Sequence, residues 1–225
     1  MSRIILPIGI LLGCTLISAC AASTTQLHYG LTIDNGTPAQ VVNLINASER
    51  VMKRRISALG VQTPNVIAVP TGGSGGTLTI DVPDEQLVTR IQQILAEKFT
   101  FDMRLELKET TAQDQNAEEN WEKLGVENQH LIGVQVVGDE KTGEVAVELL
   151  FTDEGRDLLS KAFAKYKGRT VGIFVRGVLV SKLKVENDAV SDHVVISGIP
   201  SAAVAQIFAD DVNVGLHVAF TPTGK

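Results

Sequence analysis

The order of local patterns along the chain limits its fold more than any single residue does. Strand-like and helix-like segments alternate from Leu27 onward, and through Leu107 their order is strand, helix, strand, strand, helix, strand. This order is typical of the ferredoxin-like arrangement, in which two helices cover one face of an antiparallel sheet. We therefore expect an α+β fold in which residues 27–108 form a ferredoxin-like base subdomain.

The helix expected over residues 38–59 has the clearest signals. Thr37 and Gln40 stand three residues apart, as in a capping box, and a proline occupies the first helical position. Gly60 suits the end of the helix. Apolar residues recur between these limits at helical spacing, namely Val42, Ile45, Met52, Ile56 and Leu59. A second helix is expected to begin after Asp84, and a strand is expected from Phe101.

The second half of the chain predicts another α+β unit. Residues 109–124 are polar and acidic, and we expect them to connect the base to a head subdomain over 125–222. Antiparallel hairpins are expected to turn at residues 138–143 and 176–177, and Thr152 can cap a helix between them.

The end of the chain is expected to hold a short helix and a last strand. The helix is expected from Ser201 to about Asp210 and the strand over residues 214–220. That last strand could return to the base.

The N-terminus has the pattern of a bacterial export signal over residues 1–19. The apolar run from Ile4 to Ile17 is too short for a comfortable membrane span, which needs about 20 residues. The residues before Cys20 resemble the lipobox, so we expect cleavage there and attachment of lipid, including palmitate, to Cys20. Residues 20–26 would then form a short linker. A plain signal or anchor with an incidental cysteine, and modification of Cys14, are the less favoured alternatives.

Charge and motifs argue against several function classes. A formal net charge of −6 disfavours nucleic acid as a partner, because that binding requires cations against phosphates. The four histidines are far apart in sequence, no Gly-x-Ser-x-Gly motif occurs, and the glycine-rich residues 71–76 lack a following Gly-Lys-Ser/Thr. We therefore expect no catalytic residues, metal or cofactor, and keep an envelope hydrolase with a spatially assembled site as a remote alternative.

Residues 158–185 contain seven basic residues and no acidic one. An ordinary solvated face is one interpretation, since strands and helices must place polar side chains outward. A basic face that contacts an anionic partner or membrane surface is the other. A hydrophobic groove between the two subdomains could instead take an extended peptide by strand addition.

Three segments, in this order, resemble the first periplasmic domain of the SecD family of preprotein translocase subunits. The first is ERVMKRRISALGV (residues 49–61), with LTIDVP (78–83) after it. The second is VELLFTDEGRDLLSKAFAKYKGRTVGIFVRGVLVSKLKV (147–185), which is similar to the head of that domain. The third is VVISGIPSAAVAQIFADDVNVG (194–215). Residues 1–225 show nothing like the family's membrane-spanning bundle, so none is expected here, and SKLKVENDAVSDHV (181–194) stands in place of a proline-containing segment. Proton-driven movement is therefore not carried over.

The resemblance implies a domain that contacts polypeptide, here expected to be tethered by lipid and to face the periplasm. Because Ala21 rather than an aspartate follows Cys20, we expect the outer membrane. The favoured function is non-enzymatic binding of polypeptide clients or a secretion-related protein complex, and the alternative is a scaffold for an envelope machine with one dedicated partner. The candidate contact residues lie on the head hairpin and an adjacent basic face: Lys161, Lys165, Arg176, Gly177, Val178, Val180 and Lys182.

Overall fold

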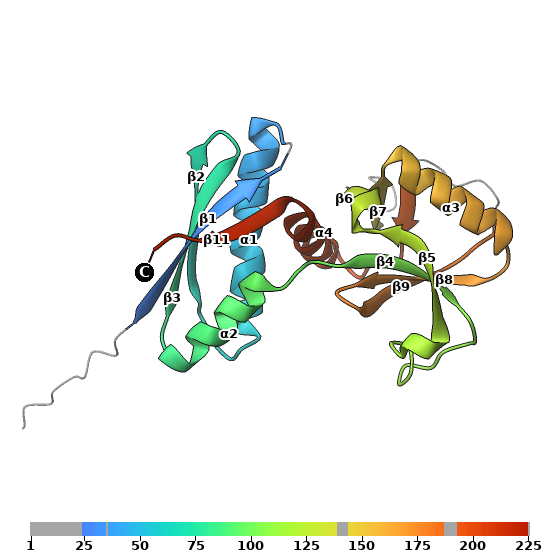
Figure 1. Cartoon of the computed structure of the whole chain (residues 1–225), viewed down its shortest axis with the longest axis horizontal. Helices are drawn as coiled ribbons and strands as arrows, with labels where there is room; N and C mark the ends of the chain where they lie inside the picture. The colour runs from blue at the N-terminus through green and yellow to red at the C-terminus, as the bar shows by residue number, and fades with distance from the viewer. Residues whose placement is uncertain (1–23, 35, 139–143, 187–192, 225) are drawn as a thin grey trace, which may run out of the picture.

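The computed structural model describes residues 24–34, 36–138, 144–186 and 193–224, and within them the chain forms four α-helices and three antiparallel sheets (Figure 1). The helices are α1 (Pro38–Ser57), α2 (Glu85–Ala96), α3 (Asp153–Lys165) and α4 (Ala202–His217). The strands are β1 (Thr25–Ile33), β2 (Asn65–Gly72), β3 (Gly75–Val82), β4 (Phe101–Glu106), β5 (Trp121–Glu127), β6 (Leu131–Gly138), β7 (Val145–Phe151), β8 (Thr170–Val175), β9 (Val178–Lys184), β10 (His193–Ile196) and β11 (Val218–Pro222). Two short 3₁₀ helices, η1 (Glu118–Asn120) and η2 (Asn128–His130), flank β5.

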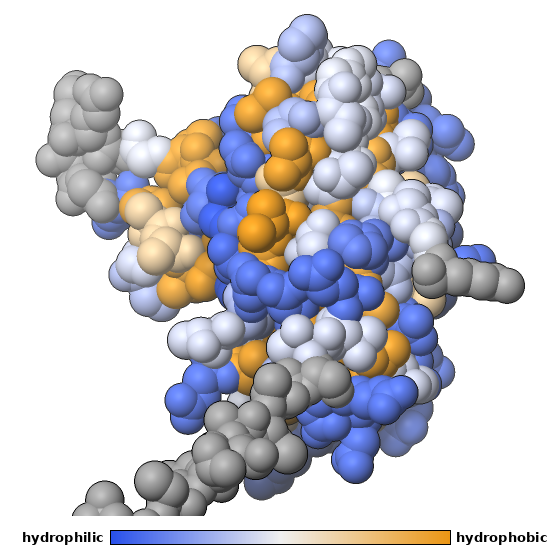
Figure 2. All heavy atoms as spheres, turned by 90° about the vertical axis from the view of Figure 1, so that its left-hand side faces the viewer, coloured by the Kyte–Doolittle hydropathy of each residue, from blue (hydrophilic) through white to orange (hydrophobic). Residues whose placement is uncertain are grey.

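The base subdomain is a four-stranded sheet in the order β11-β1-β3-β2, covered on one face by α1 and α2 (Figure 1). Its core lies between the sheet and the helices and includes Leu31 and Leu78 of the sheet, Ile45 of α1 and Ile91 of α2. On the opposite face, Ile67 and Val69 of β2 are 51% and 49% exposed. Figure 2 shows apolar and polar side chains mixed on this side of the molecule.

The expected strand order needs one correction, because β4 does not join the base sheet. It pairs with β5 and β8 instead, and β11 takes the fourth place beside β1. All six residues of β4 are buried, as suits a central strand with a packed layer on each face. Local periodicity predicts that a strand exists but not which sheet it enters.

The head subdomain is therefore an insertion between α2 and β11. It contains the sheet β5-β4-β8-β9, the sheet β10-β7-β6, and α3. Inward-facing side chains of both sheets and of α3 share one core, whose largest buried members include Phe101, Met103, Phe151 and Ile173. Helix α4 lies between this core and the base (Figure 1), and it contributes Ala205, Ala209 and Val212 to the head and Val214 to the base.

The predicted start of α1 is confirmed. The hydroxyl of Thr37 accepts a hydrogen bond from the backbone N–H of Gln40, and the side chain of Gln40 accepts one from the backbone N–H of Thr37. This is the reciprocal capping box that satisfies two free donors at the helix end. The buried face differs by one position, because Val41 is 4% exposed whereas the expected core residue Val42 is 42% exposed.

Helix α4 is longer than the sequence predicts. It continues to His217, through the segment that was expected to begin the last strand, and β11 starts only at Val218. Gly215 lies inside the helix against the ring of Phe99, where an added Cβ would overlap the ring atoms. The glycine is therefore explained by close packing and not by the end of a helix.

The acidic connection is also shorter than predicted, because β5 occupies residues 121–127. The signal segment with Cys20 and the hairpin turn at 139–143 lie outside the described residues. Within the described ranges, no helix is long and apolar enough to cross a bilayer.

Candidate functional site

The β8–β9 hairpin presents two of the predicted contact residues, Val178 and Val180, to solvent. Arg176 and Gly177 form its turn with positive φ angles of 52° and 74°, as a two-residue type I′ turn requires. Strand β9 lies at the edge of its sheet, and its Val178 and Val180 are 53% and 41% exposed. The hairpin therefore carries an exposed apolar pair on an edge strand, which we call the β9 edge.

Arg176 has a different environment from its neighbours in the hairpin. Its side chain is only 17% exposed, lies over the ring of Phe99 at 5.4 Å, and approaches Glu97 and Asp211 at 3.5 and 3.6 Å. Its backbone N–H also donates to the carbonyl of Thr100. Burial, and then repulsion from Arg55, lower the pKa of Arg176, while the two carboxylates oppose this shift. Arg176 thus joins the hairpin to the base.

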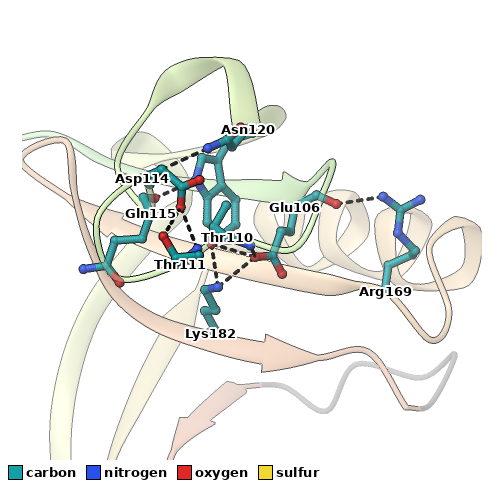
Figure 3. A network of polar contacts seen from close by, with 9 residues as sticks. Glu106, Thr110, Thr111, Asp114, Gln115, Asn120, Arg169 and Lys182 are labelled. Atoms are coloured by element: carbon teal, nitrogen blue, oxygen red, sulfur yellow. Dashed lines mark hydrogen bonds and ion pairs between the residues drawn. The ribbon is translucent and has the colours of Figure 1, made fainter.

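Lys182 also has internal partners (Figure 3). Its ammonium donates to Glu106 Oε1 and to Thr110 Oγ1, each at 2.7 Å, and lies 5.6 Å from the ring of Trp121. Burial raises the pKa of Glu106, but the hydrogen bonds from Lys182 and Thr110 outweigh it, so this pKa lies below the ordinary value. Lys182 therefore stabilises the head, with its side chain 32% exposed.

The acidic connection packs against the same sheet through hydrogen bonds of its own (Figure 3). Trp121 donates from its ring nitrogen to the carbonyl of Gln115 at 2.7 Å, and the Trp121 ring lies against Gly172, where an added Cβ would be within 2.6 Å. Asn116 Oδ1 accepts from the backbone N–H of Leu179 at 2.9 Å. The connection thus satisfies one backbone donor of the β9 edge near its turn.

Lys161 and Lys165 lie on α3, away from the hairpin. Both residues are exposed, and Lys165 Nζ lies 4.8 Å from the ring of Tyr166. In Figure 1 the helix and the β8–β9 turn are on opposite sides of the head. The structure therefore does not bring the predicted contact residues into one surface.

A salt-bridge cluster between α1 and α4 was not predicted from the sequence. Arg50 donates to both carboxylate oxygens of Asp210 at 2.8 Å, Arg54 lies 3.6 Å from Asp210, and Arg55 lies 2.5 Å from Asp211. Burial raises the pKa of Asp210, but the hydrogen bonds from Arg50 and Gln206 outweigh it and hold that pKa below the ordinary value. The arginine-rich stretch at 50–55 was visible in sequence, but its partners are about 160 residues away.

A cleft of about 1030 Å³ lies beside this cluster, between α1, α4 and β6. Six of the side chains that line it end in carboxamides: Gln40, Asn43, Asn46, Gln135, Gln206 and Asn213. A groove between base and head is expected from the sequence to be hydrophobic. The observed lining is mixed, because Leu44, Ile132 and Leu150 also contribute to it.

Two side chains of α4 hold β6 at the floor of the cleft. Asn213 accepts from the backbone N–H of Val134 at 2.8 Å and donates to its carbonyl at 2.7 Å. His217 Nε2 lies 2.8 Å from the carbonyl of Ile132. The Asn213 carboxamide thus pairs with this edge strand as a neighbouring peptide group would.

The histidines do not gather into a site. His130 is buried, and its Nδ1 accepts from the backbone N–H of Glu127 at 3.1 Å. His193 Nε2 lies 3.6 Å from Glu148. In the part of the chain that the structure describes, no group of three or more His, Cys, Asp or Glu side chains could hold a metal ion.

The arrangement of sheets and helices matches a solved structure. SecDF from Thermus thermophilus, described as a translocon-associated membrane protein, aligns over 89% of this chain with a TM-score of 0.54 and 19% sequence identity. The fold resembles that of the SecDF periplasmic domain. The chain spans about 30% of the length of that SecDF chain, so the match concerns a part of SecDF.

Two further SecDF structures align with this chain. One, described as a membrane component that enhances protein export, aligns over 88% of this chain and 99% of its own, with a TM-score of 0.47 and 20% identity. The other is SecDF in a super-membrane-facing form, with 89% and 30% coverage, a TM-score of 0.48 and 19% identity. No protein-family profile matches the chain, and no curated protein matches it in sequence.

Proposed function

We propose that this protein is a non-enzymatic lipoprotein of the bacterial envelope that binds polypeptide clients or a secretion-related protein complex. Its SecDF-like fold supports a role linked to protein export, because the SecDF of similar fold is a translocon-associated membrane protein. The observation that carries the binding function is the exposed pair Val178 and Val180 on the β9 edge. Exposed apolar side chains on an edge strand are suited to contact with another polypeptide.

Strand addition is the mode of contact that this geometry favours. An extended segment would pair with backbone groups of the outer edge of β9 other than the Leu179 N–H, which Asn116 already binds, while Val178 and Val180 offer apolar contact. The exposed Lys184 on the same strand disfavours edge-to-edge pairing of two copies of this chain, as edge lysines commonly do. The edge therefore suits a different, extended polypeptide better than a second copy.

Photocrosslinking in living cells tests this function. A photoreactive residue at position 178 should form adducts with many different secreted proteins, identified by mass spectrometry. Position 69 is the matched control, because Val69 is similarly exposed, at 49%, but lies on the base sheet. A single recurrent envelope protein would instead favour a scaffold with one dedicated partner.

Two sets of variants separate the apolar and basic versions of the site. Val178→Thr with Val180→Thr should reduce client capture with little change in stability, because both side chains are exposed and threonine is also β-branched. Lys161→Glu with Lys165→Glu tests the basic face of α3. If only the lysine variants reduce capture, the client-binding surface is α3 and not the β9 edge. Lys182 is left unchanged, since its substitution would break the contact with Glu106.

A further inference from the structure

The two sides of the cleft between α1, α4 and β6 differ in whether their polar side chains already form hydrogen bonds within the protein. On the α4 side, Asn213 bonds the backbone of Val134, and Gln206 Nε2 donates to Asp210 at 2.8 Å. On the α1 side, Asn43 and Asn46 are exposed, and no hydrogen bond within the described ranges engages their carboxamides. They stand three residues apart on the helix and so face the same way.

The cleft has little net charge to offer a ligand. Its lining charges include Arg50 and Asp210, which neutralise each other across two 2.8 Å hydrogen bonds, and Asp34. Between the polar groups lie the apolar side chains of Leu44, Ile132 and Leu150, and Ile132 is 51% exposed. The cleft thus combines uncharged donors and acceptors with apolar contact area.

This combination matches the chemistry of an extended peptide main chain. A carboxamide carries both a donor and an acceptor, so it can pair with a peptide group in the way that Asn213 already pairs with Val134. Such pairing involves only the main chain of the peptide, so binding would depend little on the peptide's amino-acid sequence. A sugar ligand fits less well, because aromatic stacking platforms are missing among the lining residues, and a charged ligand would find few unpaired charges.

We propose that this cleft is a binding site for an extended polypeptide segment, whose main chain is bound by the carboxamides of Asn43 and Asn46 and whose apolar side chains contact Ile132. This inference rests on the proposed function and assigns it a site distinct from the β9 edge. The volume of about 1030 Å³ is at the upper end of the range of ligand sites, as a short peptide needs.

Peptide binding to the purified full-length protein in detergent tests the proposal. The probe is a fluorescent ten-residue peptide of Thr, Val, Ser and Gly, and a second probe has the same sequence with N-methyl groups on alternate residues. Asn43→Ala with Asn46→Ala should weaken binding about tenfold or more, since two hydrogen bonds are lost. Alanine is a good helix former, so the variant should fold.

The matched control is Gln92→Ala with Gln93→Ala, which removes two exposed carboxamides from α2, outside the cleft. The control should bind the probe as the unchanged protein does. The N-methylated probe should bind the unchanged protein at least tenfold more weakly. Half of its peptide N–H groups are replaced by N-methyl groups, so they cannot donate hydrogen bonds to the carboxamide oxygens.

Two results overturn the cleft site while leaving the proposed function in place. In one, the Asn43 and Asn46 variant binds the probe normally and only the Val178 and Val180 variant loses binding. In the other, an oligomer of N-acetylglucosamine displaces the probe from the cleft, which would identify a glycan site. If the unchanged protein binds neither the probe nor an unfolded secreted protein, the proposed function itself is wrong, and the cleft inference fails with it.

Discussion

Arg50 and Asp210 are joined by two hydrogen bonds of 2.8 Å, although 160 residues separate them in sequence. One lies on α1 of the base, and the other lies on the helix between base and head. The Asp210 carboxylate is 3% exposed, whereas the Arg50 side chain is 48% exposed. The pair therefore combines a buried acceptor with a partly solvated donor. Its contribution to the free energy of unfolding is best measured by substituting the buried residue, Asp210.

Asp210→Asn should destabilise the protein by about 1–3 kcal/mol, because it replaces a charge-assisted pair with a neutral one in a buried place. Urea unfolding at pH 7 measures this loss. Asp34→Asn is the control, because Asp34 is exposed and its substitution should change the free energy of unfolding by less than about 0.5 kcal/mol. Equal effects of the two variants would show that the cluster adds no stability.

The same carboxylate should make stability depend on pH. The pKa of Asp210 in the folded protein lies below its ordinary value, so its stabilising contribution is present above about pH 4 and is lost as pH falls through the folded pKa. The difference in Tm between the unchanged protein and Asp210→Asn should therefore shrink between pH 5 and pH 3. A difference that stays constant over this range would contradict the lowered pKa.

Substitutions of Arg176 should separate backbone strain from side-chain contact. Arg176→Asn and Arg176→Ala both remove the contacts with Phe99, Glu97 and Asp211, but asparagine tolerates the positive φ of 52° better than alanine does. Arg176→Asn should therefore be more stable than Arg176→Ala by about 1 kcal/mol. Chemical denaturation checks this order, and identical stabilities would show that the turn is not strained.

Gly215→Ala should destabilise the protein by more than about 2 kcal/mol, since the new Cβ would overlap the ring of Phe99. This sign is informative, because alanine in place of glycine inside a helix normally stabilises by about 1 kcal/mol. Asn43→Ala, at an exposed position of α1, is the control and should be neutral or slightly stabilising. Thermal unfolding of both variants tests the packing of Phe99 on α4.

Cys20→Ser should release the protein from membranes, because it removes the expected site of lipid attachment. Radioactive palmitate should label the unchanged protein and not this variant. Cys14→Ser is the matched control and should leave both labelling and membrane association intact. Loss of labelling in the Cys14 variant alone would show that the lipid is attached to Cys14.

Local signals in the sequence were sufficient to predict most helix starts. The side chains of Thr37, Asp84 and Thr152 each accept a backbone hydrogen bond at the start of the predicted helix. These contacts span two or three residues, so they can be inferred without the rest of the fold. The turn at Arg176 and Gly177 was predictable for the same reason.

What the sequence did not predict depends on distant partners. Strand β4 was assigned to the base because its order along the chain fits, whereas its pairing with β8 depends on residues about 70 positions away. The sequence places the end of α4 too early, because β-branched residues near Gly215 are typical of strands. The packing against Phe99, which explains a helical glycine there, cannot be inferred from local sequence. The ion pairs of Arg176 and Lys182 could not be predicted for the same reason, since their partners Asp211 and Glu106 are remote in sequence.

The insertion of the head between α2 and β11 sets the order in which the protein can finish folding. A chain that emerges from its N-terminus presents β1, β2 and β3 long before Val218–Pro222 arrive to pair with Tyr29–Ile33. Until then β1 is an open edge, available to other extended chains. Completion of the base thus depends on Val218–Pro222, and until they pair, the free edge of β1 is an extended segment of the kind that the β9 edge is proposed to bind.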